Sequence, residues 1–119
     1  MSFKSCLVTG LLVSAGGVVA QNPTPGLHSL FVAAGKLFFG TATDTNLFND
    51  TQYLAIAQDA NEFGLWVPEN SQKWQPTEPT QGKFAFTNPD QVAQGSRTNG
   101  QMFRCHTLTW HSQLPDFGQ

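Results

Sequence analysis

The sequence predicts an α/β fold with parallel strands, and three observations support this prediction. Segments typical of strands and of helices alternate along the chain, as in folds whose helices connect parallel strands. Each strand segment is short and mainly apolar, as buried strands are. Polar residues follow directly after each strand, at Asp44, at Glu69 and Asn70, and from His106 to Gln113. Because the carboxyl ends of the strands form the active face of eight-stranded α/β barrels, a parallel barrel is the leading candidate.

The first strand and the first helix are expected before residue 64. Residues 37–43 form an apolar and β-branched run that is typical of a buried strand. Residues 51–63 carry apolar side chains at three-to-four spacing, which predicts a helix with Asp50 as its N-cap. Gly64 stands where such a helix often ends.

A second helix is expected between the two remaining strands. Residues 65–67 form the second strand, and residues 88–99 form the second helix, with Pro89 near its first turn. Gly95 inside this helix costs about 1 kcal/mol of helix propensity relative to alanine. Residues 102–108 form the third strand.

The composition is that of a globular protein with a neutral polar surface. The chain has 6 Lys and Arg against 8 Asp and Glu, which gives a net charge of -2. Such a balance cannot neutralise the phosphates of a nucleic acid, so we expect no nucleic-acid partner. A glycine-rich phosphate loop, a serine nucleophile elbow and an amphipathic lipid-binding stripe are all missing, so we expect neither phosphate chemistry nor a membrane partner.

The first residues are typical of an export signal. Lys4 precedes an apolar run over residues 6–19, and small residues lead up to Ala20. We therefore expect residues 1–20 to be a signal peptide and the protein to be secreted. The alternative, a membrane anchor, would need about 20 apolar residues, and this run is shorter. Residues 21–27, rich in Pro and Gly, are expected to form a linker.

Removal of the signal peptide would also remove Cys6, one of the 2 cysteines. Cys105 then has no partner within the chain, which is unusual in an oxidising compartment. We expect Cys105 to be buried as a small apolar side chain, and the alternative is a disulfide with a cysteine outside these residues.

A separate motif, Asn49-Asp50-Thr51, matches the N-glycosylation pattern. In an exported chain it predicts a surface glycan on Asn49, beside the first helix.

The densest polar cluster covers residues 68–74, after the second strand. It combines the carboxylate of Glu69, the amide of Asn70, the ammonium group of Lys73 and the indole of Trp74. This mixture suits a sugar, because carboxylates and amides bond hydroxyl groups while an aromatic ring packs on the apolar face of a pyranose. The alternative is a solvated loop in which Glu69 pairs with Lys73 and Trp74 belongs to the core.

A second cluster, residues 106–113, places His106 and His111 on either side of Trp110. A zinc site is disfavoured, because no third ligand is evident and the residues of a strand and its loop share no fixed face. The histidines suit hydrogen bonds to a hydroxyl or a carboxylate, with Trp110 as a floor. The alternative is a pair of buried histidines whose hydrogen bonds are satisfied within the protein.

Groups of residues along the whole chain recur in one known family. They are residues 39–43, 62–64, 67–71 with 73 and 74, 78 and 79 with 81 and 82, and 106–115 apart from Thr109. Together they resemble glycoside hydrolase family 10, the secreted endo-1,4-beta-xylanases. The resemblance implies that residues 28–119 are the amino-terminal part of the catalytic domain, a partial (β/α)8 TIM barrel with about its first three β/α units. It also implies hydrolysis of internal β-1,4-xylosidic bonds of xylan with retention, with no cofactor and no metal.

The resemblance assigns substrate binding to side chains that suit hydroxyl groups by their chemistry. The family positions that hold xylose hydroxyls match Glu69, Asn70, Lys73, His106, Trp110 and Gln113. The position that matches His111 belongs to the same inner shell. Xylan or xylo-oligosaccharides are therefore the expected partners.

The sequence departs from the family pattern at several positions. Gln72 replaces a small or thioether residue, and Gln75 replaces an acid. Trp66 and Cys105 stand where smaller residues are usual, and Gly95 stands where a bulkier one is usual. Added volume on a packed strand costs about 1 to 3 kcal/mol, so we expect some loss of stability from Trp66 and Cys105.

No catalytic residue is assigned in this chain. In the family the acid/base glutamate ends the fourth strand and the nucleophile ends the seventh, and Glu69 and Glu78 match positions with other roles. We therefore expect the chain alone to be inactive. One alternative is a non-catalytic module that binds xylan or xylo-oligosaccharides, and another is self-association through unpaired barrel strands.

Overall fold

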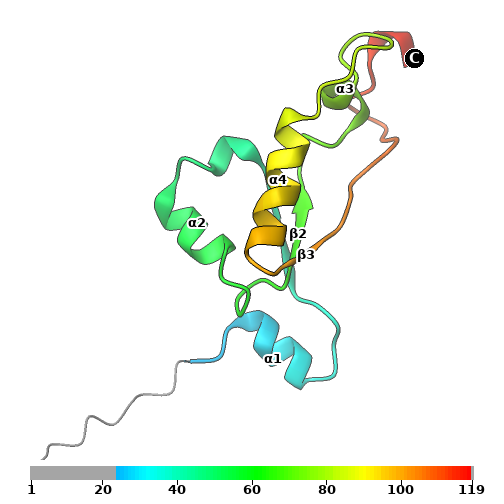
Figure 1. Ribbon diagram of the computed structural model, residues 1–119. Coiled ribbons are helices and arrows are strands. Elements are labelled where there is room, and N and C mark those ends of the chain that lie inside the picture. Colours follow the sequence, from blue (N-terminus) through cyan, green and yellow to red (C-terminus); the bar gives the residue numbers. More distant parts are fainter. Residues whose placement is uncertain (1–23, 119) are drawn as a thin grey trace, which may run out of the picture.

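The computed structural model describes residues 24–118 (Figure 1). In chain order the elements are α1 Leu27–Ala33, β1 Gly40–Thr43, the 3-10 helix η1 Thr45–Leu47, α2 Thr51–Ala57, β2 Leu65–Pro68, α3 Trp74–Thr77, α4 Thr87–Thr98, β3 Met102–Phe103 and the 3-10 helix η2 Asp116–Gly118. The expected signal peptide, residues 1–20, lies outside the described residues. None of the helices within residues 24–118 combines the length and the apolar character needed to cross a bilayer.

The strands β1, β2 and β3 form a parallel sheet in that order. Thr41 lies beside Trp66, and Trp66 lies beside Phe103 on the next strand. Helices α2 and α4 each connect one strand to the next, so the predicted start of an α/β barrel is confirmed. The strands point toward α3 and the C-terminal segment, whereas α1 lies at the opposite end of the sheet (Figure 1).

The buried core lies between the sheet and the helices α2 and α4. Its buried members are Ala57 on α2, Trp66 on β2 and Val92 on α4. Partly buried rings surround them, those of Phe48, Tyr53 and Phe103. The indole N–H of Trp66 donates to the Ala57 carbonyl (2.7 Å), so the largest buried side chain also satisfies its polar atom.

The second strand and the second main helix match their predicted ranges to within one residue at each end. β2 is Leu65–Pro68, against the predicted 65–67, and α4 is Thr87–Thr98, against the predicted 88–99. Asp50 is the N-cap of α2, as predicted, because its Oδ1 accepts the backbone N–H groups of Gln52 and Tyr53 (3.0 Å each).

The first strand is shorter than predicted, because β1 begins at Gly40 rather than at residue 37. The backbone N–H of Phe39 donates to Nδ1 of His28 (3.1 Å), which holds this part of the chain against α1. Leu37 is consequently 83% exposed, so the expectation of a strand that is buried along its length was wrong.

Helix α2 ends at Ala57, and the predicted continuation to residue 63 was wrong. The Ala57 carbonyl, which a longer helix would use for the N–H of Asn61, instead accepts Nε1 of Trp66 (2.7 Å) and Nε2 of Gln101 (2.8 Å). The Asn61 N–H donates to Oδ1 of Asp59 (2.8 Å), a local turn that competes with the helix.

Strand β3 also ends early, at Phe103, because the next rung of its ladder with β2 cannot form. The N–H of Arg104 still donates to the Trp66 carbonyl (3.0 Å), but the following donor on β2 would be Pro68, which has no N–H. Cys105 therefore lies beyond the strand and is exposed, which contradicts the expectation that it is buried.

Helix α1 was not predicted from the sequence and is held by contacts with the loop before β2. The N–H groups of its first turn, from Leu27, His28 and Ser29, donate to oxygens of Glu62 and Asn61. These bonds satisfy donors that have no partner within the helix. Gly26 permits the approach, because a Cβ there would lie 2.4 Å from the Asn61 carbonyl oxygen.

Candidate functional site

The polar residues that follow the strands meet at the carboxyl end of the sheet. Glu69 comes directly after β2, and its backbone N–H donates to the Thr43 carbonyl at the end of β1 (3.2 Å). Lys73 is the N-cap of α3, and within α3 the Gln75 N–H donates to the Gln113 carbonyl (3.0 Å). These two bonds join the end of β1 to the end of β2, and the loop after β2 to the loop after β3.

A buried carboxylate, that of Asp44, connects the first two loops. Its Oδ2 accepts the backbone N–H groups of Asn70 and Ser71 (2.8 Å each), and its Oδ1 accepts the N–H of Thr45 (2.9 Å). Burial raises the pKa of Asp44, but the backbone N–H groups of Asn70, Ser71 and Thr45 outweigh it, so the pKa lies below its ordinary value. Asp44 is therefore ionised at neutral pH.

Lys73 lies between an amide and an aromatic ring. Its Nζ donates to Oδ1 of Asn70 (2.8 Å) and lies 5.8 Å from the centroid of the Trp110 ring. The first contact is a charge-assisted hydrogen bond and the second has cation–π geometry. Both partners stay accessible, because Asn70 is exposed and Trp110 is 39% exposed.

The second predicted cluster is arranged around the same tryptophan. The His106 ring meets Trp110 edge to face, with 5.7 Å between centroids, and His111 lies 4.4 Å from Trp110 on the same measure. The backbone N–H of His106 donates to Oε1 of Gln72 (3.2 Å), which links this loop to the one after β2. His106 is half-buried and His111 is exposed, so the alternative of two buried histidines does not describe the pair.

Gln113 is held apart from this group of contacts. Its Oε1 accepts the hydroxyl of Ser112 (2.8 Å), and its backbone adopts a left-handed conformation with φ of 51°. Contacts therefore join Asn70, Lys73, His106, Trp110 and His111, while Glu69 belongs to the group by its place in the chain. We call these six residues together with Gln113 the polar cluster.

Both carboxylate oxygens of Glu78 accept hydrogen bonds from the protein itself. Its Oε1 accepts the N–H of Gly82 and its Oε2 accepts Nε1 of Trp74 (2.8 Å each). The Gly82 N–H, followed by the Trp74 indole, holds the pKa of Glu78 below its ordinary value. Because Trp74 belongs to α3 and Gly82 to the loop after it, the Glu78 carboxylate fastens α3 to that loop. The Trp74 ring also packs against Phe117 (6.0 Å between centroids).

A cavity of about 580 Å³ borders the polar cluster. Residues from three segments line it: Gln72, Thr77, Phe86, Pro89, Asp90 and 105–108. His106 and Gln72 supply polar atoms at its wall, and Leu108 and Phe86 supply apolar surface. Within residues 24–118, no group of three or more His, Cys, Asp or Glu side chains is placed to hold a metal ion.

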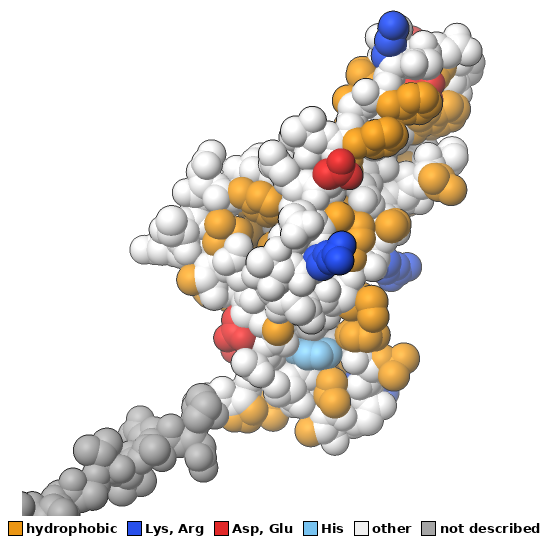
Figure 2. Space-filling view, viewed as in Figure 1, with side chains coloured by type: hydrophobic (Ala, Val, Ile, Leu, Met, Phe, Trp, Pro, Cys, Tyr) orange, Lys and Arg blue, Asp and Glu red, His pale blue; other side chains and the backbone are white. Residues whose placement is uncertain are grey.

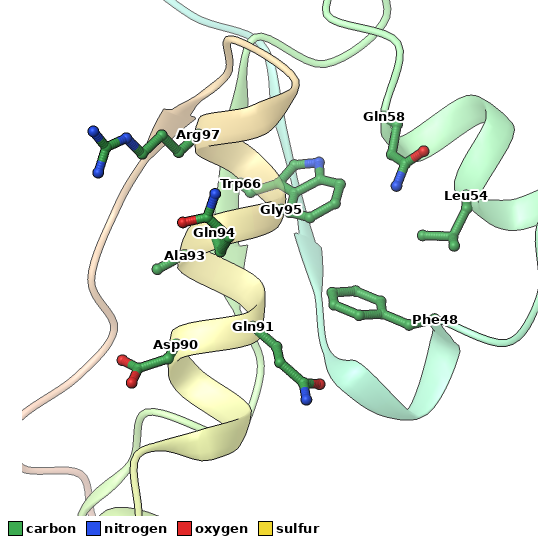
Figure 3. Close-up of a pocket in the computed structure, with 10 residues that line it drawn as sticks. All are labelled: Phe48, Leu54, Gln58, Trp66, Asp90, Gln91, Ala93, Gln94, Gly95 and Arg97. Carbon is green, nitrogen blue, oxygen red and sulfur yellow. The ribbon is translucent and has the colours of Figure 1, made fainter.

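A larger cavity of about 780 Å³ lies elsewhere, between α2 and α4 (Figure 3). Trp66, Phe48 and Leu54 form its apolar wall, and α4 contributes Gln91 and Gln94. It lies on the helical side of the sheet and shares no lining residue with the polar cluster. The surface in the view of Figure 2 carries few charged side chains.

Two residues that organise the site, Asp44 and Gln72, were given no binding role by the sequence patterns. Asp44 was noted only as the polar residue directly after the first strand, a place where a carboxylate can accept N–H groups of the next loop. Gln72 had only its departure from the family pattern as a signal, because its partner, His106, lies 34 residues away.

The sequence is similar to those of known proteins of one family. The sequence matches the profile of glycosyl hydrolase family 10 over residues 26–119. Endo-1,4-beta-xylanase 5 of Pyricularia oryzae is 50% identical over 98% of this chain, and the match covers 32% of that relative. The chain thus spans about a third of the length of this curated relative.

Two solved structures contain a part with the same fold as this chain. A GH10 xylanase from Bispora sp. MEY-1 with xylobiose gives a TM-score of 0.71 at 36% identity, covering 77% of this chain and 28% of that chain. Xylanase 10B from Thermotoga petrophila RKU-1 in complex with xylobiose gives a TM-score of 0.71 at 26% identity, covering 82% and 30%.

Proposed function

Because the chain belongs to glycosyl hydrolase family 10, we propose that it forms the part of an endo-1,4-beta-xylanase that holds the xylose units of xylan. The polar cluster would bind these units: Glu69, Asn70, Lys73, His106, Trp110, His111 and Gln113. Relatives solved with xylobiose support a xylo-oligosaccharide as the ligand.

The observation that carries this proposal is the placement of Lys73 against both Asn70 and Trp110. An amide and an ammonium group in contact offer a donor and an acceptor to vicinal hydroxyl groups, as a sugar requires. The exposed Trp110 ring offers an apolar surface to the pyranose beside them. The contact of Asn70 with Lys73 is local, but a solvated loop without a ligand gives no reason for Trp110, from the loop after β3, to join them.

We propose that the enzyme hydrolyses internal β-1,4 bonds with retention. That reaction needs two carboxyl groups about 5 Å apart, one as nucleophile and one as acid/base. Glu78 is committed to the Gly82 N–H and the Trp74 indole, and the resemblance gives neither Glu69 nor Glu78 such a role. The polar cluster would position and orient the substrate, and residues 1–119 taken alone would bind xylo-oligosaccharides without cleaving them.

The test uses the 119-residue chain and xylotriose. Titration followed by amide NMR should shift the signals of Asn70, Lys73, His106 and Trp110. Lys73→Met should weaken binding about 10-fold or more, because it removes a charge-assisted hydrogen bond. Lys36→Met is the matched control, since Lys36 is exposed in the loop that follows α1.

Either of two results would contradict the proposal. Xylotriose that shifts no signal of the polar cluster would remove the binding role. Release of reducing sugar from soluble xylan by the purified chain would show that these residues cleave the substrate by themselves. Binding without release would also agree with the second candidate, a xylan-binding module that has no catalytic role in a larger enzyme.

We also propose that residues 1–20 direct secretion and that Asn49 carries a glycan. Asn49 is exposed, just before α2. Self-association is a further proposal, because β1 and β3 are the edges of the sheet within the described residues. Light scattering behind a sizing column would show a discrete oligomer if these edges pair, and a monomer would contradict the pairing.

A further inference from the structure

We propose that Asp44 is a positioning residue of the polar cluster, which holds Asn70, and through it Lys73, in the geometry that receives a xylose unit. This inference rests on the proposed function. Asp44 does not touch the substrate in this account and acts through the backbone of the loop after β2.

The Asp44 carboxylate is bonded to the backbone. Asp44 is 5% exposed, and its two oxygens accept three backbone N–H groups, those of Thr45, Asn70 and Ser71. Two of these donors belong to the loop after β2, whereas Asp44 itself directly follows β1. These bonds use most of the acceptor capacity of a carboxylate that is already buried, so its effect is on the loop.

The loop after β2 also connects Asp44 to the groups proposed to bind the sugar. The Asn70 carbonyl accepts the Lys73 N–H (2.9 Å), and the Asn70 side chain accepts Nζ of Lys73 (2.8 Å). Nζ in turn lies over Trp110, which belongs to the loop after β3. A displacement of the Asn70 backbone would therefore move the amide, the ammonium group and their relation to the indole together.

The site is sensitive to displacements of its backbone. Exposed side chains such as Asn70 have few other contacts to fix them, so the backbone decides where the amide points. A misplacement of about 1 Å in a binding constellation can cost on the order of 100-fold in activity. The ionised state of Asp44, maintained by its N–H donors, keeps all three bonds charge-assisted.

The test compares Asp44→Asn with a matched control, Asp59→Asn. The neutral amide introduced by Asp44→Asn would offer one acceptor oxygen where the wild-type carboxylate has two, and its NH2 group would face an N–H donor at the other position. The three bonds therefore cannot all form, and those that remain lose the charge that strengthens them. Asp59 also accepts a backbone N–H, that of Asn61 (2.8 Å), but it lies in the turn after α2, before β2. We expect xylotriose affinity to fall about 10-fold or more in Asp44→Asn and less than about 2-fold in Asp59→Asn.

A second readout needs no sugar. Because Nζ of Lys73 lies over the Trp110 ring, the ring current should shift the NMR signals of the adjacent Lys73 methylene, and this shift would report the position of Lys73. In Asp44→Asn it should move toward the value of a free lysine, while the signals of Val92 and Ala57 in the core stay in place. If Asp44 contributed only to general stability, the Lys73 signals and the core signals would change together.

The outcomes decide both proposals separately. If the wild type does not bind xylotriose but the Lys73 shift is lost in Asp44→Asn, the proposed function fails and the positioning stands. An unchanged Lys73 shift and unchanged affinity in a folded Asp44→Asn would overturn the positioning. If Asp44→Asn does not fold, Asp44→Glu, which keeps the charge on a longer side chain, should fold with a smaller shift of the Lys73 signals. A failure of both variants to fold would make Asp44 a stability residue and overturn the proposal.

Discussion

The indole of Trp66 occupies the space that Gly95 leaves open on α4. A Cβ built on Gly95 would lie 2.8 Å from Cζ3 of Trp66, closer than packed atoms approach. The resemblance led us to expect a smaller residue at position 66 and a bulkier one at position 95. The two departures therefore compensate each other across the interface between β2 and α4 (Figure 3), and the strain expected from Trp66 alone is relieved.

Because Trp66 packs against Gly95, we expect Gly95→Ala to destabilise the protein, although alanine favours a helix over glycine by about 1 kcal/mol. The added methyl group overpacks against a fully buried ring, which costs about 1 to 3 kcal/mol. We expect a lower urea midpoint for Gly95→Ala in wild type. In a Trp66→Val background the same change should raise the midpoint. Gln94→Ala, at an exposed position of the same helix, is the control, and an increase in the midpoint on Gly95→Ala in wild type would refute the pairing.

Gln101 joins the end of α2 to the chain before β2, and its loss should be costly. Its Nε2 donates to the carbonyls of Ala57 (2.8 Å) and Phe63 (2.7 Å), and the residue is 6% exposed. Gln101→Met removes the donor to the Phe63 carbonyl and one of the two donors to the Ala57 carbonyl. We therefore expect the free energy of unfolding, measured by chemical denaturation, to fall by about 2 to 3 kcal/mol. Gln91→Met on the exposed part of α4 should change stability by less than about 0.5 kcal/mol, and equal losses for the two variants would contradict this account.

The stability of the chain should fall in acid, in part because of Asp44. Its pKa in the folded protein lies below the ordinary value of 3.8. The carboxylate therefore stabilises the fold at pH values above 3.8, and this contribution is lost as the pH falls through the folded pKa. Between about pH 7 and pH 3 the urea midpoint of the wild type should fall more than that of Asp44→Asn. Glu78, whose pKa is also lowered, leaves a residual pH dependence in the variant. Parallel losses in the two proteins would exclude Asp44 as a source.

Secretion of the chain from a eukaryotic host tests the glycan on Asn49. We expect a product that loses mass on treatment with an N-glycosidase and that Asn49→Gln makes insensitive to the enzyme. Asn46→Gln, at an exposed position of η1 outside the motif, should remain sensitive. A wild-type product without mass change would show that the motif is unoccupied.

Local patterns were sufficient for some elements and not for others. The range of α4 follows from its own residues, such as Pro89 in its first turn and Gly100 after its end, where φ is 70°. The end of α2 depends instead on Trp66 and Gln101, which bind the Ala57 carbonyl from 9 and 44 residues away. No periodicity within residues 51–63 contains that information.

In the candidate site too, some contacts follow from local residues and others depend on distant ones. Asn70 and Lys73 are three positions apart, and their contact follows from the local chain, as the composition of the cluster suggested. The approach of Trp110 depends on where β3 stops, and that point is set by a proline on the neighbouring strand. The burial expected for Cys105 failed for the same reason, because the chain has already left the sheet at that residue.

The missing N–H of Pro68 has a consequence for how the cleft can vary. Past this residue the sheet no longer dictates the separation of the loops after β2 and β3, and the bond between Gln72 and His106 bridges them instead. Next to His106, the gap between the two loops thus depends on the length and chemistry of the Gln72 side chain, while the bond from the Gln75 N–H to the Gln113 carbonyl joins them farther along. A substitution at position 72 can widen or narrow the groove while the register of every strand stays the same.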